Sequence, residues 1–169
     1  LSSWNVSNVT NMNSTFYNCH RFNQSLNNWN VSNVVSMAAM FWDCNDFNQP
    51  LNNWNISNVT TMNQMFTSSG FNQSINEWTI TNLTHARYMF AGTPFNHPLD
   101  NWNNSNITDM SHMFYLASQF NQDITGWIVS NIKDMKHMFN GASSFNQDIS
   151  QWDVSNVTDM SSMFESTNE

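Results

Sequence analysis

Residues 145–164 read FNQDISQWDVSNVTDMSSMF, and this stretch decides the fold because variants of it recur along the whole chain. Its Trp152 is the last of seven tryptophans in one register, separated by steps of 24 or 25 residues. A Met-Phe pair follows the Trp in nearly every unit, and a Phe-Asn pair precedes the next Trp. A fixed period of this size is typical of a solenoid or another repeat array. The tryptophans of the register are Trp4, Trp29, Trp54, Trp78, Trp102, Trp127 and Trp152.

One segment of the unit varies in length. The step from the Phe of the Met-Phe pair to the Phe of the following Phe-Asn pair is six residues in four units and five in two. The sequence therefore indicates one loop per turn that tolerates deletion, whereas the rest of the turn keeps its length.

The spacing of apolar residues within a unit predicts its local structure. In residues 22–41, Trp29 and Val31 alternate with polar neighbours, which is typical of a short, half-buried strand. The apolar residues that follow have spacings of three, three and one, as on one face of a helix; they are Val34, Met37, Met40 and Phe41. We therefore expect a leucine-rich-repeat-like solenoid, with a parallel sheet of short strands on one face and short helical or 3₁₀ segments on the other.

Residues 1–169 are expected to form a single solenoid of about seven turns. Polar terminal caps keep such arrays soluble. Neither end of the sequence shows one, so we expect a fragment of a longer repeat protein.

The register also predicts what is buried. The Trp and Met-Phe columns should form the core, with each Trp in contact with the Trp of the next turn. Asn104 occupies a column that otherwise holds Val or Ile. We expect it to be at least partly buried and to bond to backbone or to a trapped water, because an unpaired buried amide is costly.

Two columns of Asn recur along the chain, and we interpret both as structural. Amides at turns can bond to the backbone of a neighbouring turn or to one another. Many lie in Asn-x-Ser/Thr sequons, as at Asn8 and Asn58, which we attribute to the repeat because a buried Asn cannot accept a glycan. The columns are Asn8, Asn33, Asn58, Asn82, Asn106, Asn131 and Asn156, and Asn23, Asn48, Asn72, Asn96, Asn121 and Asn146.

Cys19 and Cys44 occupy the same position in adjacent turns. Neighbouring strands lie ~4.8 Å apart, and the Cα atoms of bridged cysteines lie ~4.4–6.8 Å apart, so a disulfide is geometrically allowed. The alternative is a small residue packed under the loop, where later turns place Ala117 and Ala142.

The composition excludes several functions. The net charge is −8, and four basic residues are too few for a phosphate-binding surface, so nucleic acid is excluded as a partner. Aromatic residues make up 14% of the chain and stand in strict register, which argues against disorder. No stretch approaches the ~18 apolar residues of a membrane span, so we expect no membrane insertion by this segment. The basic residues are Arg21, Arg87, Lys133 and Lys136.

No motif predicts catalysis or a cofactor, so we expect no enzyme and no catalytic residue. His112 and His137 share a column, but two His are too few for a zinc site, and we interpret them as exposed polar residues. Asp109, Asp134 and Asp159 form an acidic column in the last three turns. They are weak candidates for a calcium site, since a bound cation would relieve their repulsion; the alternative is a solvated acidic stripe.

Two regions carry candidate binding residues. The exposed strand positions beside Trp vary among turns, as expected of a specific surface; they are Asn28, Asn30, Asn53, Asn55, Glu77, Thr79, Asn101, Asn103 and Ile128. In the loop, Tyr17, Trp42 and Tyr115 share the position directly after the Met-Phe site, and Trp42 is the one Trp outside the core register. Trp and Tyr dominate binding hot spots. The alternative for Trp42 is that it covers the edge of the core near Cys44.

The unit at residues 145–164 resembles the repeat of BspA-like leucine-rich-repeat surface proteins, which also occurs in mycoplasma-type lipoproteins. The resemblance covers the whole chain. It implies an extracellular or cell-surface protein that recognises or adheres to a host or cell-surface protein or glycan, and it implies no catalytic residues.

A structural element that stacks end to end is the alternative function, because uncapped, similar turns permit heterologous self-association. A weaker alternative is ice binding through a column of Thr, which Val35 and Lys133 interrupt.

Overall fold

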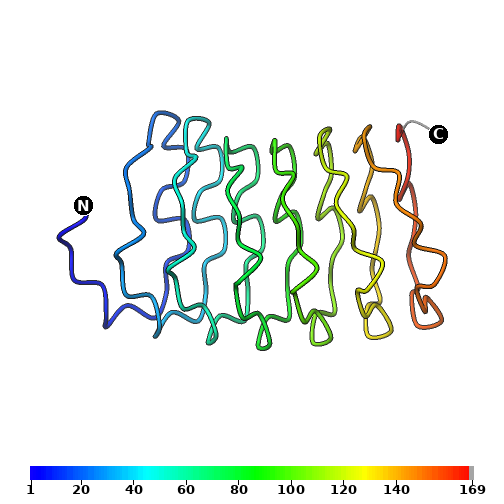
Figure 1. Ribbon diagram of the computed structural model, residues 1–169, viewed down its shortest axis with the longest axis horizontal. Helices are drawn as coiled ribbons and strands as arrows, with labels where there is room; N and C mark the ends of the chain where they lie inside the picture. The colour runs from blue at the N-terminus through cyan, green and yellow to red at the C-terminus, as the bar shows by residue number, and fades with distance from the viewer. Residues whose placement is uncertain (168–169) are drawn as a thin grey trace.

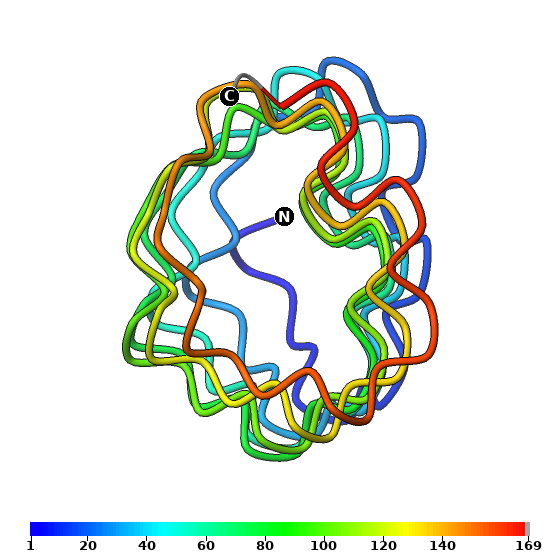
Figure 2. The ribbon, with the colours of Figure 1, turned by 90° about the vertical axis from the view of Figure 1, so that its right-hand side faces the viewer.

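The computed structural model describes residues 1–167, in which the chain winds through successive coils stacked along one axis (Figure 1). Seen along that axis, the coils follow nearly one outline, and the N-terminal segment lies inside it (Figure 2). Each coil is one repeat unit, because residues one period apart pair as parallel bridges: Asn11, Ser36, Thr61, His85, Asp109, Asp134 and Asp159. We number the coils 1 to 7 by their tryptophans, from Trp4 to Trp152.

The expected parallel sheet with helical segments is wrong. Residues 1–167 contain no α-helix or 3₁₀-helix, and only isolated bridges in place of β-strands. Tight turns interrupt the segment predicted as a strand: Trp29 N–H donates to the Leu26 carbonyl, and Val34 N–H donates to the Val31 carbonyl, both at 2.9 Å. Local turns thus use the backbone groups that a sheet would need.

A ribbon of turns replaces the expected helix at residues 37–44 and their counterparts, which we call the turn ribbon. Met40 N–H donates to the Met37 carbonyl (3.3 Å), whereas Ala39 N–H donates to Asn63 O of the next coil (2.8 Å). Ala39 and Asp43 have φ values of 54° and 57°. This left-handed region is closed to a right-handed helix. Since the same two positions are left-handed in every coil, the N–H groups alternate between the local turn and the next coil.

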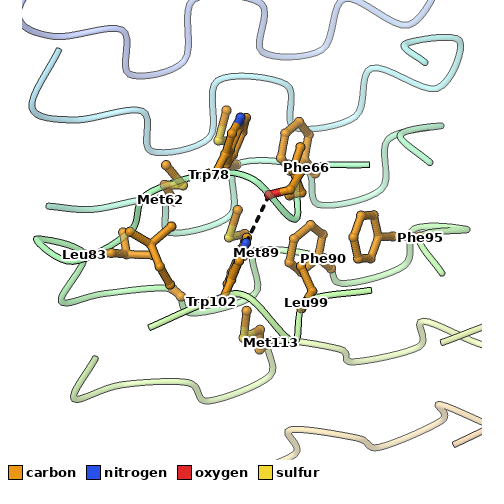
Figure 3. Packing of buried hydrophobic residues seen from close by; sticks show 14 of the residues in the cluster. Met62, Phe66, Trp78, Leu83, Met89, Phe90, Phe95, Leu99, Trp102 and Met113 are labelled. Atoms are coloured by element: carbon orange, nitrogen blue, oxygen red, sulfur yellow. Dashed lines mark hydrogen bonds between the residues drawn. The ribbon is translucent and has the colours of Figure 1, made fainter. Parts of the chain in front are cut away.

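The predicted burial of the Trp column is confirmed from Trp29 to Trp152, and Trp78 is only 3% exposed. Figure 3 shows Trp78 and Trp102 in successive coils beside the Phe residues of the core. Trp102 and Trp127 stack with ring centroids 6.5 Å apart. Trp4 is 61% exposed, because no coil precedes it in the structure.

Phenylalanines form the second buried column and extend the stack from coil to coil. Phe41 and Phe66 lie face to face with centroids 5.7 Å apart, and Phe66 stacks on Phe71 at 4.0 Å. Offset aromatic stacks contribute about 0.5–1.5 kcal/mol each beyond their buried area. Between them, the Trp and Phe columns form a core that is continuous along the stack.

Each buried indole N–H is satisfied by the preceding coil. Trp54 Nε1 donates to Leu26 O at 2.9 Å, and Trp78 Nε1 donates to Leu51 O at 3.1 Å. A buried indole needs such a partner. The Trp column therefore holds the coils together by hydrogen bonds as well as by apolar contact.

The structural interpretation of both Asn columns is confirmed. Asn58 Nδ2 donates to Ser32 O of the preceding coil at 2.8 Å, and Asn23 Oδ1 accepts from Asn48 N–H of the next coil at 3.1 Å. The assumption that the sequon Asn residues are buried is wrong, because Asn8 and Asn58 are exposed. At Asn58, the nitrogen that would carry a glycan is instead bonded to the neighbouring coil.

Cys19 and Cys44 are free thiols in this structure. The Cys44 thiol is buried and donates to Phe16 O at 2.9 Å, and burial raises its pKa to about 12. Cys44 therefore packs as a small core residue under the loop. Within residues 1–167, no helix is long and apolar enough to cross a bilayer.

Candidate binding site

The structure divides the predicted binding residues between two regions of the coil. The first is the Trp side, where all of the strand-type candidates are exposed: Asn28, Asn30, Asn53, Asn55, Glu77, Thr79, Asn101, Asn103 and Ile128. Two shallow hollows lie there, of about 360 Å³ beside Trp29 and about 340 Å³ beside Trp78.

Several amides on the Trp side are already engaged in the fold. Asn30 Oδ1 accepts from Ser32 N–H at 3.2 Å, and Asn103 Oδ1 accepts from Ser105 N–H at 3.3 Å. Asn101 Nδ2 donates to Glu77 Oε1 at 3.2 Å. Asn commonly forms local turns of this kind whether or not a ligand binds. These residues are therefore weak evidence for a binding site.

The second region is a larger hollow of about 590 Å³ that crosses four coils. Trp42 of coil 2 and Tyr115 of coil 5 lie at its two ends, and both small and large residues of coils 3 and 4 line it between them. We call it the aromatic hollow. Two of the three loop aromatics predicted from the sequence, Trp42 and Tyr115, line the hollow, and Tyr17 does not.

Register explains why the chain is hollow at this place. Trp42, Thr67, Ala91 and Tyr115 occupy one position of the turn ribbon in successive coils, so two small residues separate two large aromatic ones. Both Trp42 and Tyr115 are half-buried. Coils 3 and 4 therefore lack a large side chain at this position.

Coils 3 and 4 are also the two coils with the shortened loop, from Phe66 to Phe71 and from Phe90 to Phe95. Gly70 lets the first of these loops lie against coil 2. A Cβ atom on Gly70 would stand 2.2 Å from Asn45 O. Since no side chain fits that gap, the glycine allows the shortened loop to lie this close to coil 2, where Gly70 N–H donates to Cys44 O at 3.2 Å.

Polar groups in the hollow are held by the backbone of the neighbouring coil. Asn63 Oδ1 accepts from Arg87 N–H at 2.9 Å, and Thr67 Oγ1 donates to Tyr88 O at 2.7 Å. Gln64 and Ser68 also line the hollow. These bonds orient two of the side chains that a ligand would meet.

Arg87 is the one charged residue among those that line the hollow. Its guanidinium lies 5.2 Å from the centroid of the Tyr88 ring, in cation–π range. Within residues 1–167, the only basic nitrogen within 4 Å of a carboxylate oxygen is His20 Nδ1, which lies 3.5 Å from Asp43 Oδ2. No carboxylate therefore pairs with Arg87, although the chain has a net charge of −8.

A row of rings supports the hollow from one side. Tyr88 stacks on His112 with centroids 4.1 Å apart, and His112 is followed by His137 at 4.8 Å. Tyr115 meets Tyr88 edge-on at 6.3 Å. The row holds Tyr88 and Tyr115 in place.

The expectation that His112 is an exposed polar residue is wrong, since it is 8% exposed. Its Nδ1 atom is buried without a hydrogen-bond partner. Burial, and then the charges of His137 and Arg87, lower the pKa of His112 to about 4. His112 therefore stays neutral at physiological pH and acts as an aromatic spacer.

The acidic column lies along the bridges between coils. Asp109 and Asp134 each accept a hydrogen bond from a backbone N–H two residues ahead, both at 2.9 Å, and Asp159 does the same. No group of three or more His, Cys, Asp or Glu able to hold a metal ion occurs in residues 1–167.

Sequence reasoning missed Arg87 and Tyr88 as site residues. The signal for the hollow was present in the two shortened loops and in the small residues between Trp42 and Tyr115. The two patterns meet only in the folded chain, where residues of both shortened loops line the hollow between Trp42 and Tyr115.

The stacked coils define a repeat protein, and the aromatic hollow is its larger candidate binding site. The family model described as "Mycoplasma protein of unknown function, DUF285" matches residues 1–97 and 92–169, which together cover the chain. The chain belongs to this DUF285 family. No curated protein and no solved structure matches it.

Proposed function

We propose that the chain is a non-catalytic recognition or adhesion module, at the cell surface or secreted, which binds a protein or a glycan. The aromatic hollow is the observation that supports this most strongly. The likeness of residues 145–164 to the BspA-like surface repeat supports the location. Host or cell-surface molecules are the partners that this location would offer.

The chemistry of the hollow favours binding over a purely structural role. Trp42 and Tyr115 offer large, rigid surfaces that lose little conformational entropy on binding. A volume of about 590 Å³ falls within the ~300–1,000 Å³ of ligand sites. On the Trp side, by contrast, the hollows are smaller, at about 360 and 340 Å³, and several amides already close turns.

A binding screen against oligosaccharides and extracellular proteins tests the proposal, with two folded variants compared with the parent chain. Trp42→Ala alters the aromatic hollow, and the triple variant Glu77→Ser, Thr79→Ser, Ile128→Ser alters the Trp side. We expect the first to weaken binding at least about tenfold, as loss of a hot-spot aromatic does, and the second to leave it nearly unchanged.

The same screen has outcomes against the proposal. Loss of binding only in the triple variant would mean that the ligand binds on the Trp side and not in the aromatic hollow. If neither variant changed binding, recognition through either surface would be wrong. Concentration-dependent sedimentation of the parent chain would then favour the self-assembling element as the better account.

A further inference from the structure

We propose that the aromatic hollow binds an oligosaccharide at a sugar unit that carries a carboxylate, with Arg87 pairing with that acid group. This inference rests on the proposed function and names its ligand class. Three features of the hollow support it: its aromatic ends, its amides and hydroxyls, and its single unpaired cation.

The shape of the hollow suits an elongated ligand with apolar faces. Trp42 and Tyr115 are three coils apart, and the core Phe rings of these successive coils are spaced by 5.7, 5.9 and 5.6 Å, so the hollow is elongated along the stack. A sugar presents C–H faces that stack on an aromatic ring and hydroxyl edges that need hydrogen bonds. A chain of sugar units can therefore contact Trp42 at one end and Tyr115 at the other.

Amides and hydroxyls between these aromatics match the hydroxyl edges of sugars. An amide side chain both donates and accepts, as a sugar hydroxyl does. Arg87 N–H donates to Asn63 Oδ1. This bond fixes the orientation of the Asn63 amide and therefore the direction of its Nδ2 donors. Gln64 and Ser68 add further groups of the same kind.

The charge of the hollow selects an acidic sugar over a neutral one. The Arg87 guanidinium has no carboxylate partner among residues 1–167, and a planar fork of donors matches a carboxylate in bidentate geometry. With a net charge of −8, the chain repels a polyanion. The expected ligand therefore carries isolated carboxylates rather than a dense row of them.

The test uses trisaccharides that carry one uronic acid, each paired with its uncharged methyl ester, in calorimetric titrations of the full chain. The acid should bind roughly tenfold more tightly than the ester, which corresponds to about 1.4 kcal/mol, because charge-assisted hydrogen bonds are roughly twice as strong as neutral ones. Arg87→Gln should abolish that difference. Lys133→Gln, which makes the same charge change at an exposed site outside the hollow, should preserve it.

Several results would overturn the inference. One is equal affinity for every acid and its ester; another is an equal loss of acid binding in Lys133→Gln and Arg87→Gln, since that indicates overall charge. Tighter binding of a sulfated counterpart would reject the carboxylate. If no acidic trisaccharide bound while a protein or neutral glycan bound in a Trp42-dependent way, the inference would fail and the proposed function would stand.

Discussion

The side chain of Asn104 bonds to both backbone polar groups of Ile128 in the next coil. Asn104 Nδ2 donates to Ile128 O at 3.1 Å, and Ile128 N–H donates to Asn104 Oδ1 at 3.0 Å. Asn104 is 1% exposed. The expectation that this buried amide bonds to backbone is confirmed, and one side chain here replaces a rung of the missing sheet.

Replacing Asn104 by Val should lower the free energy of unfolding by about 1–2 kcal/mol. Two bonds of about 0.5–1.5 kcal/mol each are lost, and added apolar contact offsets part of the loss. Denaturant unfolding measures the change. Asn103→Ala is the control, because its exposed amide closes only a local turn. An equal loss of stability in both variants would mean that the bonds to Ile128 stabilise the fold no more than this local turn does.

Trp78→Ala should cost about 3–5 kcal/mol, as truncation of a large core residue does. The indole is 3% exposed and its N–H is bonded to Leu51 O. Trp4→Ala removes the same side chain where it is 61% exposed, and should cost far less. Chemical denaturation of both variants provides the comparison, and a loss below about 1 kcal/mol for Trp78→Ala would contradict its burial.

Gly70→Ala should destabilise the chain by roughly 1–3 kcal/mol, the usual range for forced overpacking. The new Cβ would meet Asn45 O at 2.2 Å, so the shortened loop of coil 3 must move outward. At Gly126, a Cβ meets nothing within 4 Å, so Gly126→Ala should be tolerated. Thermal unfolding of the pair distinguishes the two sites, and equal melting temperatures would show that the loop adapts freely.

The buried His112 should make the fold less stable as pH falls from about 6.5 to about 4. Its pKa is about 4 in the folded chain and ordinarily about 6.5 when unfolded. In this window the unfolded chain takes up a proton that the folded chain does not, so stability is lost. Around the ring, His137, Arg87 and Lys136 oppose protonation and Asp134 favours it.

His112→Tyr should flatten the pH dependence in that window. Tyr is compatible with the site, since Tyr88 occupies the same register position with a similar φ of 56°. Unfolding measured at several pH values checks this. An unchanged slope between pH 6.5 and 4 would show that other groups cause the acid sensitivity.

Period and burial were predictable from sequence, because a Trp or Phe that recurs every 24 or 25 residues must pack against its copies. Local structure was not. The first left-handed position of the turn ribbon holds residues such as Ala39 and Tyr88, which carry no signal for positive φ. The second includes Asn18, Asp43, Gly92 and Gly141, which favour positive φ, but the spacing of Met37, Met40 and Phe41 predicted a helix.

The candidate site was predictable in part. Trp42 and Tyr115 were identified from their shared register, and the hollow between them follows from small residues and shortened loops that the sequence contains. Arg87 could not be assigned to it, because its place beside Tyr88 depends on how the turn ribbon folds.

The central claim is that ligands bind in the aromatic hollow, and filling the hollow tests it most directly. Thr67→Trp places an aromatic between Trp42 and Tyr115, at the register position that both of them occupy. Asn140→Trp makes a matched change at the same position of coil 6, outside the hollow. The measurement is binding of folded parent and variants to one immobilised panel of oligosaccharides and extracellular proteins. The account predicts that Thr67→Trp loses binding and Asn140→Trp keeps it; full binding by folded Thr67→Trp would contradict the account.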